Sequence, residues 1–224
     1  MSFRKEEKLN INKNQLFNLL EWVVKNGGHK LYDDRIVSST YFDNDNLQMF
    51  KDSEEGIVPR KKVRIRSYHK GEHEIDSSTF EIKRSSVEGR FKTSTKEFNL
   101  QKALKFGYFD PEYGVLKPKA RVSYKRSYYR VLNVRLTIDR DIEYVKINNQ
   151  NKETYKTDEK DIIVEVKADS EISVEYLYRN FSFDRIRFSK YSKAINSFYK
   201  SNMKKSPKIA ITGLNPHCES NFYS

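Results

Sequence analysis

Charged and apolar residues alternate along short segments of the chain, a pattern that predicts β-strands because successive side chains of a strand point to opposite faces. The clearest segment is Val58–Tyr68, VPRKKVRIRSY. One face of this strand would carry four cations, namely Arg60, Lys62, Arg64 and Arg66. Like charges spaced about 7 Å apart repel one another, so we expect this face to lie against an anionic partner.

The same alternation recurs in six further segments. They are Phe3–Leu9, Thr79–Arg84, Arg90–Lys92, Arg121–Arg130, Val134–Asp139 and Val164–Lys167. Their polar positions are mostly Arg, Lys and Glu, whereas the solvated face of an antiparallel sheet, the alternative interpretation, usually mixes in Thr, Ser, Asn and Gln. With Arg35–Phe42 the chain has eight long strands. We therefore expect an α+β fold, in which an eight-stranded antiparallel β-barrel encloses a charged interior and helices pack outside.

Helical spacing of apolar residues separates several of these strands. Asn12 can cap a helix that runs to about Asn26 and ends at Gly27 and Gly28. Further helices are expected at about Asp45–Lys51, Leu100–Phe106, Ser173–Phe181 and Tyr191–Lys200. A loop holding Pro111, Gly114 and Pro118 and a polar insertion at Lys146–Lys160 are expected between strands.

Composition narrows the possible partners of the protein. The chain has 224 residues, enough for one large domain or two small ones, and 43 Lys and Arg against 31 Asp and Glu give a net charge of +12. Such a charge attracts polyanions. The single cysteine, Cys218, excludes an internal disulfide, and no apolar run approaches the roughly 20 residues of a membrane span. We expect a cytoplasmic protein, associated with a membrane only through a partner.

The charged positions indicate phosphate chemistry. Arg and Lys donors match phosphate oxygens. The inward carboxylates could hold Mg²⁺ or Mn²⁺, which bridges phosphate oxygens during transfer, or each could simply pair with a neighbouring cation. These carboxylates are Glu6, Glu81, Asp139 and Glu165. The chain contains no glycine-rich phosphate loop and no Cys/His set with metal-ligand spacing.

An ordered set of motifs resembles a known family. The set comprises R-x-E-x-K (Arg4, Glu6, Lys8), KVRIRSY, FEIK, VSYKRSYY, VRLTIDRD, IVEVK and RFSKY. Together these segments resemble the VTC (vacuolar transporter chaperone) polyphosphate polymerase domain of the CYTH-like triphosphate tunnel metalloenzyme superfamily, over about Phe3 to Tyr199. The resemblance implies a tunnel with a C-terminal helix at its mouth, in which ATP donates its terminal phosphoryl group to polyphosphate with the help of Mn²⁺ or Mg²⁺.

The resemblance also implies site residues. The catalytic set is Lys8, Arg64, Arg66, Lys83, Arg126 and Arg135. Further phosphate contacts, partly taken from the alternation alone, are Arg4, Lys62, Lys92, Tyr124, Lys167, Arg187, Ser189, Lys190 and Lys193. Glu165 matches the metal carboxylate of the family, and the inward placement of the other three carboxylates adds them to the candidate metal ligands.

One departure from the family pattern and two alternative functions remain. The superfamily opening E-x-E-x-K reads R-x-E-x-K here, which disfavours a triphosphate hydrolase, such as a tripolyphosphatase or an RNA 5′-triphosphatase, without excluding it. A non-catalytic polyanion binder is the other alternative. Nucleic acid is not expected as a partner, because the aromatic residues should lie mostly on the outer, helix-covered face. A membrane-protein partner would have to come from another chain.

The C-terminal segment differs from the rest of the chain. We expect the tunnel domain to span residues 1–205 and a tail of unknown role to span 206–224. Within the tail, KIAITGLNPHCES resembles a segment of 4-hydroxythreonine-4-phosphate dehydrogenases. So short a segment cannot form that enzyme, and we assign it no function.

Overall fold

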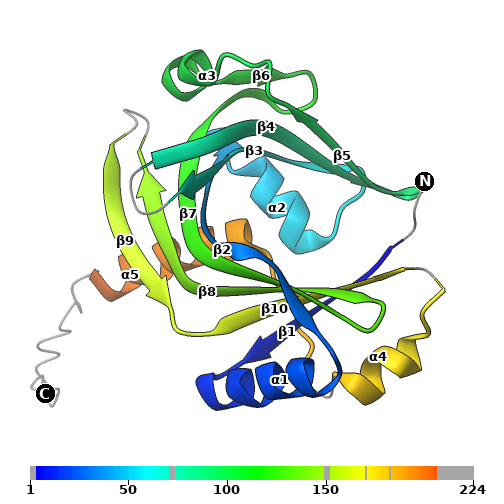
Figure 1. Ribbon diagram of the computed structural model, residues 1–224. Coiled ribbons are helices and arrows are strands. Elements are labelled where there is room, and N and C mark those ends of the chain that lie inside the picture. The colour runs from blue at the N-terminus through cyan, green and yellow to red at the C-terminus, as the bar shows by residue number, and fades with distance from the viewer. Residues whose placement is uncertain (1–3, 71–73, 149–151, 170, 182, 206–224) are drawn as a thin grey trace, which may run out of the picture.

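A curled antiparallel sheet forms the body of the computed structural model, which describes residues 4–70, 74–148, 152–169, 171–181 and 183–205 (Figure 1). Eight strands follow one another across it. In spatial order they are β1 (Arg4–Ile11), β10 (Ile162–Asp169), β8 (Val134–Ile147), β7 (Gly114–Val131), β2 (His29–Asp43), β3 (Arg60–Lys70), β4 (Glu74–Ser86) and β5 (Gly89–Thr95). These are the eight strands predicted from the alternation, so the α+β class and the antiparallel sheet are confirmed.

The sheet curls without a closing ladder. Among the described residues, β1 and β5 are the two ends of the strand order and do not pair with one another. Two short strands, β6 (Tyr108–Asp110) and β9 (Glu153–Glu159), pair with β7 and β8. The tunnel is therefore a half-barrel rather than the closed barrel expected from the strand count.

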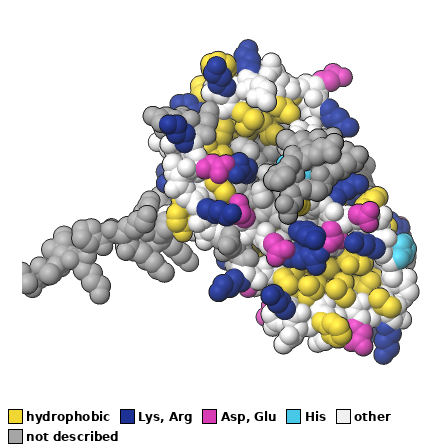
Figure 2. Space-filling view, turned by 60° about the vertical axis from the view of Figure 1, so that its left-hand side comes forward, with side chains coloured by type: hydrophobic (Ala, Val, Ile, Leu, Met, Phe, Trp, Pro, Cys, Tyr) yellow, Lys and Arg dark blue, Asp and Glu magenta, His cyan; other side chains and the backbone are white. Residues whose placement is uncertain are grey.

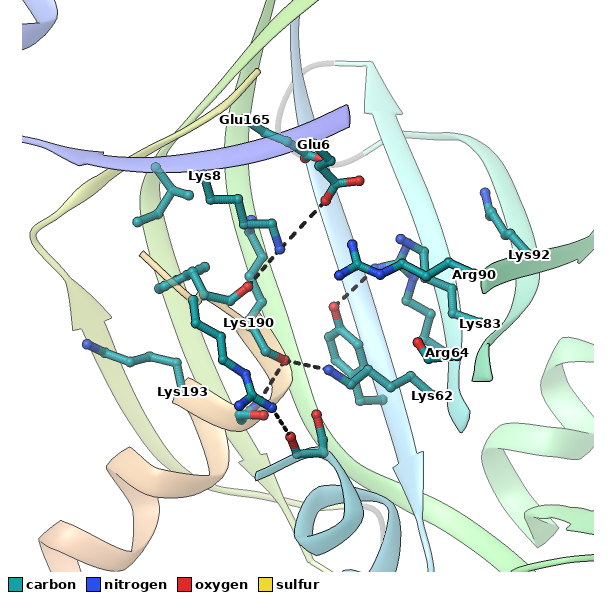
Figure 3. A pocket seen from close by; sticks show the side chains of 18 of the residues that line it. Glu6, Lys8, Lys62, Arg64, Lys83, Arg90, Lys92, Glu165, Lys190 and Lys193 are labelled. Carbon is teal, nitrogen blue, oxygen red and sulfur yellow. Dashed lines mark hydrogen bonds and ion pairs between the residues drawn. The ribbon is translucent and has the colours of Figure 1, made fainter. Parts of the chain in front are cut away.

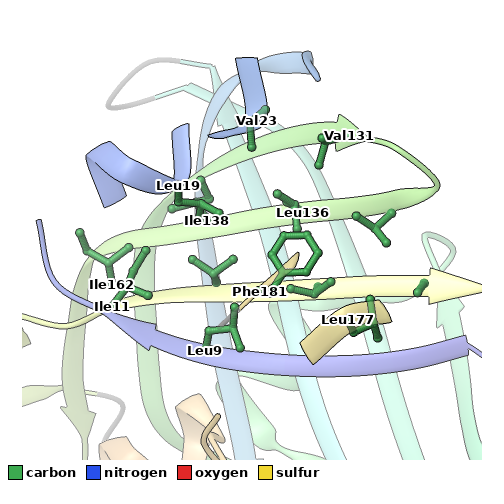
Figure 4. Close-up of a cluster of buried hydrophobic side chains, with 14 residues drawn as sticks. Leu9, Ile11, Leu19, Val23, Val131, Leu136, Ile138, Ile162, Leu177 and Phe181 are labelled. Atoms are coloured by element: carbon green, nitrogen blue, oxygen red, sulfur yellow. The ribbon is translucent and has the colours of Figure 1, made fainter. Parts of the chain in front are cut away.

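Helices α1 (Lys13–Lys25) and α4 (Val174–Asn180) cover one outer face of the sheet. Asn12 caps α1 as predicted: its side chain accepts a hydrogen bond from the Gln15 backbone at 2.9 Å, and the Gln15 side chain accepts one from the Asn12 backbone at 2.9 Å. Leu19 and Val23 of α1 are buried against the apolar positions of β1, β8 and β10 (Figure 4). This packing leaves the charged positions of the same strands facing the interior.

Helix α3 (Leu100–Phe106) and strand β6 cover the outer face of the sheet at its other end, over β3 and β4. Val63 and Ile65 of β3 are buried there, together with Phe80 of β4. The Phe80 ring stacks on Phe98 with ring centroids 3.9 Å apart. The apolar face of the most cationic strand is thus anchored outside, as the alternation predicted.

Helix α5 (Lys190–Lys205) packs onto part of the concave face. Its Tyr191 and Phe198 are buried with Tyr41, Tyr124 and other apolar side chains of β2, β7 and β8. Aromatic residues therefore pack on both faces of the sheet, and not only on the outer, helix-covered face. Many of the positions of these strands that α5 covers are apolar.

The Asp43 carboxylate, at the end of β2, connects β2 with two helices, α2 (Gln48–Glu55) and α5. The Asp43 carboxylate accepts hydrogen bonds from the backbone N–H groups of Met49 and Phe50, each at 3.0 Å, at the start of α2. It also accepts one from the Tyr191 hydroxyl of α5 at 2.7 Å. With Asn44, whose side chain caps Gln48, Asp43 sets the start of α2 three residues later than the sequence predicted.

Other expected boundaries shift as well. The polar insertion contains β9, which pairs with β8, and the Pro-rich and Gly-rich loop contains β6 and the start of β7. In the described part of the chain, no helix combines the length and the apolar character needed to span a bilayer. The predicted tail, 206–224, lies outside the described residues.

Candidate functional site

The concave face encloses a cavity of about 630 Å³ between the sheet and the N-terminal turns of α5. Fifteen Lys and Arg side chains line it, against five Asp and Glu side chains. Figure 3 shows cations from β1, β3, β4, β5 and α5 converging on this space. The cavity therefore carries ten more cations than acids, out of the surplus of twelve in the whole chain.

The outer surface differs from the cavity. On the face drawn in Figure 2, Lys and Arg side chains are scattered and several lie beside Asp or Glu. An ion pair also joins Lys156 of β9 and Glu143 of β8, at 2.5 Å. The excess positive charge of the protein is thus concentrated where the sheet curls inward.

Strand β3 supplies the cationic row predicted from the sequence. Its alternate residues, Arg60, Lys62, Arg64 and Arg66, all line the cavity. Arg66 donates to the Tyr124 hydroxyl at 3.2 Å, and Lys62 donates to the Ser189 hydroxyl at 3.0 Å. Neither cation forms an ion pair with any carboxylate that the structure describes. Both are held in place by neutral groups and can accept an anionic ligand.

Glu81, a predicted metal ligand, forms ion pairs with two cationic side chains instead. Its carboxylate accepts a hydrogen bond from Arg64 Nε at 2.7 Å and pairs with Lys92 at 2.6 Å. Although burial would raise the pKa of Glu81, the charges of Arg64 and Arg66 lower it to about 2. Glu81 is on the inward face of β4 but does not line the cavity, and its ion pair orients Arg64, which does.

The Asp139 carboxylate likewise forms ion pairs with two cationic side chains. Arg126 Nε and Nη2 donate to its two oxygens at 2.6 and 2.7 Å, and Lys190 donates at 2.5 Å. Burial opposes ionisation of Asp139, but Lys190 and Arg126 outweigh it and lower its pKa. Lys190 also lies 4.5 Å above the Tyr124 ring. Asp139 thus fixes the cations of β7 and α5 that face the cavity.

Glu6 and Glu165 are the two predicted metal ligands that the structure brings together. Their carboxyl groups lie within hydrogen-bonding reach, and burial and the Glu165 charge raise the pKa of Glu6. Burial opposes ionisation of Glu165 too, but Lys167, 2.9 Å away, together with Glu6 and Arg126 lowers its pKa. A divalent cation would relieve the crowding of the two carboxyl groups.

The donor set suits a metal that is shared with a substrate. Among the described residues, no three His, Cys, Asp or Glu side chains form a group that could hold an ion. Mg²⁺ is commonly held by one or two carboxylates together with substrate phosphates. Glu6 and Glu165 fit that pattern. Glu81 and Asp139 could bind a metal only if their ion pairs with lysine and arginine were broken.

Two lysines are held in a partly desolvated state. Enclosure by the cavity walls lowers the pKa of Lys83 to about 7, and the charges of Arg64 and Arg66 lower it further in the same direction. The Lys83 side chain is nevertheless accessible to solvent inside the cavity. Burial also lowers the pKa of Lys62 to about 8. An anion bound between these side chains would restore their full positive charge.

The segment before α5 forms one rim of the cavity. Arg187 donates to the Ser53 carbonyl at 2.6 Å, and Lys8 donates to the Phe188 carbonyl at 2.7 Å. The predicted phosphate contacts of this segment line the cavity together, namely Arg187, Ser189, Lys190 and Lys193. A helix at the mouth, expected from the resemblance, is present.

Three predicted site residues do not line the cavity. Arg135 is exposed on β8, with its guanidinium 5.7 Å from the Tyr128 ring centre. Glu81 is buried beside Arg64 and Lys92, and the Arg4 side chain lies outside the described part of the structure. The other sixteen residues, including Lys92, Tyr124 and Lys167, line the cavity.

The sequence reasoning missed some lining residues. Tyr41, whose hydroxyl accepts from Arg64 at 3.1 Å, shares the inward face of β2 with Val37 and Ser39. The alternation of Arg35–Phe42 could have revealed it. Lys61, by contrast, reaches the rim from the outer face, where it pairs with Asp110 at 3.0 Å, and no pattern within its strand signals this.

Comparisons with known proteins agree with the geometry. The sequence model of the VTC domain matches residues 3–199. An X-ray structure of a proposed adenylate cyclase from Vibrio parahaemolyticus has a TM-score of 0.53 at 12% identity, covering 87% of this chain and 98% of that one. A conserved hypothetical protein from Pyrococcus furiosus has a TM-score of 0.52 at 16% identity, covering 84% and 99%.

A comparison of the sequence with curated proteins found no match. The low identities to the two solved structures establish the fold alone. The family match covers nearly all of the described chain and agrees with the curled sheet around a cationic interior. The chain therefore belongs to the VTC domain family and has the CYTH-like triphosphate tunnel fold.

Proposed function

We propose that this protein is a metal-dependent polyphosphate polymerase, which transfers the terminal phosphoryl group of ATP to a growing polyphosphate chain. The observation that carries the proposal is the cavity wall, where fifteen cationic side chains outnumber five acidic ones. Enclosed cations need anionic partners, and a row of adjacent phosphates can compensate many of them at once. Membership of the VTC domain family supports the same substrate class.

The proposed reaction is a single phosphoryl transfer. A terminal oxygen of polyphosphate attacks the γ-phosphorus of ATP and forms a new P–O bond. The bond from that phosphorus to the bridging oxygen breaks, so ADP leaves with the electron pair and the polymer gains one phosphate. Because such transfer depends mainly on positioning and on neutralising charge, Arg64, Arg66, Lys83 and Arg126 would hold the phosphate oxygens.

Mn²⁺ or Mg²⁺ would be held by Glu6 and Glu165 together with phosphate oxygens. The ion would neutralise charge that develops on the transferred group. Lys8 lies directly opposite Glu165 in the β1–β10 ladder, so a phosphate held by Lys8 would lie beside the carboxylate pair.

The ion pairs of Glu81 and Asp139 favour phosphoryl transfer to polyphosphate over transfer to water. A hydrolase has to orient an attacking water. Glu81 and Asp139, which could otherwise do so, each accept hydrogen bonds from arginine at 2.7 Å or less. The acceptor that the cavity accommodates best is another phosphate.

Incubation with ATP and Mn²⁺, followed by gel analysis of the phosphate products, tests this proposal. We expect a ladder of polyphosphate, with ADP formed in equal amount to the phosphate incorporated. Arg126→Met should lose the ladder, whereas Lys125→Met, on the same strand but exposed on the opposite face, should keep it. Release of inorganic phosphate without a ladder would indicate hydrolysis and contradict the proposal.

A further inference from the structure

A cluster of tyrosines and arginines extends the concave face beyond the cavity, at the end of β2 opposite Asp43. Tyr32 of β2 and Tyr128 of β7 are direct neighbours in the ladder, with ring centroids 5.5 Å apart in an edge-to-face arrangement. Arg35 lies 5.3 Å from the Tyr32 ring centre, and Arg135 lies 5.7 Å from that of Tyr128. Tyr32 is 52% exposed, so its ring is available to a ligand.

This cluster is connected to the proposed catalytic centre by one row of the sheet. Tyr128 lies opposite Thr137 of β8, and Thr137 lies opposite Glu165 of β10. Directly opposed residues share a face, so all three side chains are on the concave side. Adjacent strands lie about 4.8 Å apart, which puts the tyrosine about 10 Å from the metal carboxylate.

Thr137 supplies a second, independent observation. Its side chain is only 3% exposed, and its hydroxyl oxygen has no hydrogen-bond partner among the described residues. A buried hydroxyl without a partner costs free energy, so a hydrogen bond to this group would be stabilising. In the sheet it lies between Tyr128 and Glu165.

The chemistry of the cluster selects one part of the substrate. A phosphate chain has no apolar surface and gains nothing from an exposed tyrosine ring, whereas a purine base stacks on aromatic rings and on guanidinium planes. We propose that Tyr32 and Arg35 form the nucleobase site for ATP, with the ribose and phosphates directed toward Glu165 and Lys8. This inference rests on the proposed function, because it takes ATP as the phosphoryl donor.

Binding measurements on Tyr32→Ala and Tyr32→Phe, with ATP and inorganic tripolyphosphate as separate ligands, test the inference. Tyr32→Ala should weaken ATP binding about tenfold, within the range for one base on one aromatic side chain, and leave tripolyphosphate affinity unchanged. Tyr32→Phe keeps the ring and should bind both ligands like the original protein. Because Tyr32 is half exposed, both variants should keep the original melting temperature.

Each other outcome overturns the inference. Equal losses for ATP and tripolyphosphate would mean that Tyr32 supports the phosphate cavity, and no loss for ATP would mean that the base binds elsewhere. A short oligoadenylate without a triphosphate that binds more tightly than ATP would assign the cluster to nucleic acid.

The test also separates this inference from the proposed function. If Tyr32→Ala polymerises phosphate with an unchanged KM for ATP, the nucleobase site is wrong while the polymerase assignment stands. If ATP binding depends on the Tyr32 ring but no polyphosphate forms, the nucleobase site stands and the polymerase assignment fails.

Discussion

Glu6 and Glu165 reach toward each other from neighbouring strands, so that their two carboxyl groups share one space beside Lys8 and Lys167. Burial and the neighbouring charge raise the pKa of Glu6, whereas lysine and arginine keep Glu165 ionised. The pair therefore combines a carboxylate with a group that readily takes a proton. A divalent cation can replace that proton.

Glu165→Gln tests whether this pair holds the ion. The change removes one charge with little change in shape, so tripolyphosphate should still bind through the cations. Phosphoryl transfer should fall by at least ~100-fold, because the metal's stabilisation of transition-state charge is worth several kcal/mol. Turnover of ATP measured against Mn²⁺ concentration gives the answer, with Glu143→Gln on the outer side of β8 as the control. Full activity at ordinary Mn²⁺ levels would remove Glu165 from the site.

Arg64 and Arg66 should differ in what they contribute. Both line the cavity, so Arg64→Ala and Arg66→Ala should each weaken tripolyphosphate binding measured by calorimetry. Only Arg64→Ala leaves a buried carboxylate, Glu81, with Lys92 as its remaining ion-pair partner in the described structure. Its free energy of unfolding in urea should therefore fall by about 3 kcal/mol, and that of Arg66→Ala by much less. Equal losses would contradict the ion-pair assignment.

Occupation of the cavity should stabilise the fold. A ligand that binds only the folded protein raises its melting temperature by mass action, and the surplus of enclosed cations makes the empty protein less stable. Millimolar tripolyphosphate at moderate salt should shift the melting temperature upward by several degrees in a thermal scan. An equal shift with sulfate at the same ionic strength would indicate general screening rather than a specific site.

The low pKa of Lys83 predicts opposite effects of pH on stability and on binding. With a pKa of about 7 instead of the usual 10.5, folded Lys83 binds fewer protons than the unfolded chain between these values. Stability of the empty protein should therefore rise with pH across this window and be flat below it. Tripolyphosphate favours charged Lys83, so its affinity should fall as pH rises.

Calorimetry from about pH 6 to about pH 9 measures the second effect. Lys83→Met should flatten the pH dependence of binding, whereas Arg84→Met, which changes the neighbouring residue on β4, should retain it. An unchanged pH profile in Lys83→Met would assign the titration to another group, with Lys62 as the next candidate because its pKa is about 8.

The alternation predicted strands and faces well because both depend on local sequence. A period of two fixes which side of β3 carries Arg64 and which carries Val63, whatever the neighbouring strands are. The cap of α1 was predictable for the same reason, since Asn12 and Gln15 are three residues apart. The order of the strands in the sheet was not predicted, because it depends on pairing between segments that are far apart in the sequence.

The alternation within one strand could not predict which side chain on a neighbouring strand each carboxylate contacts. Glu81, Asp139 and Glu165 all alternate inward, but only Glu165 meets a second carboxylate, because β10 lies beside β1. Glu81 meets Arg64 across the β3–β4 ladder. Likewise, Arg135 lies on the inward face yet beyond the cavity, since register along the strand, not its face, decides the distance from the site.

The Asp43 carboxylate has a mechanical consequence. Because it binds the first turn of α2 and the hydroxyl of Tyr191 in α5, neither helix can shift alone without stranding a buried acceptor, which is costly. Ser53 of α2 is in turn fastened to Arg187, just ahead of α5. A displacement of the start of α5 would therefore be transmitted to α2 through Asp43 and through Arg187, so the two helices are mechanically coupled beside the cavity.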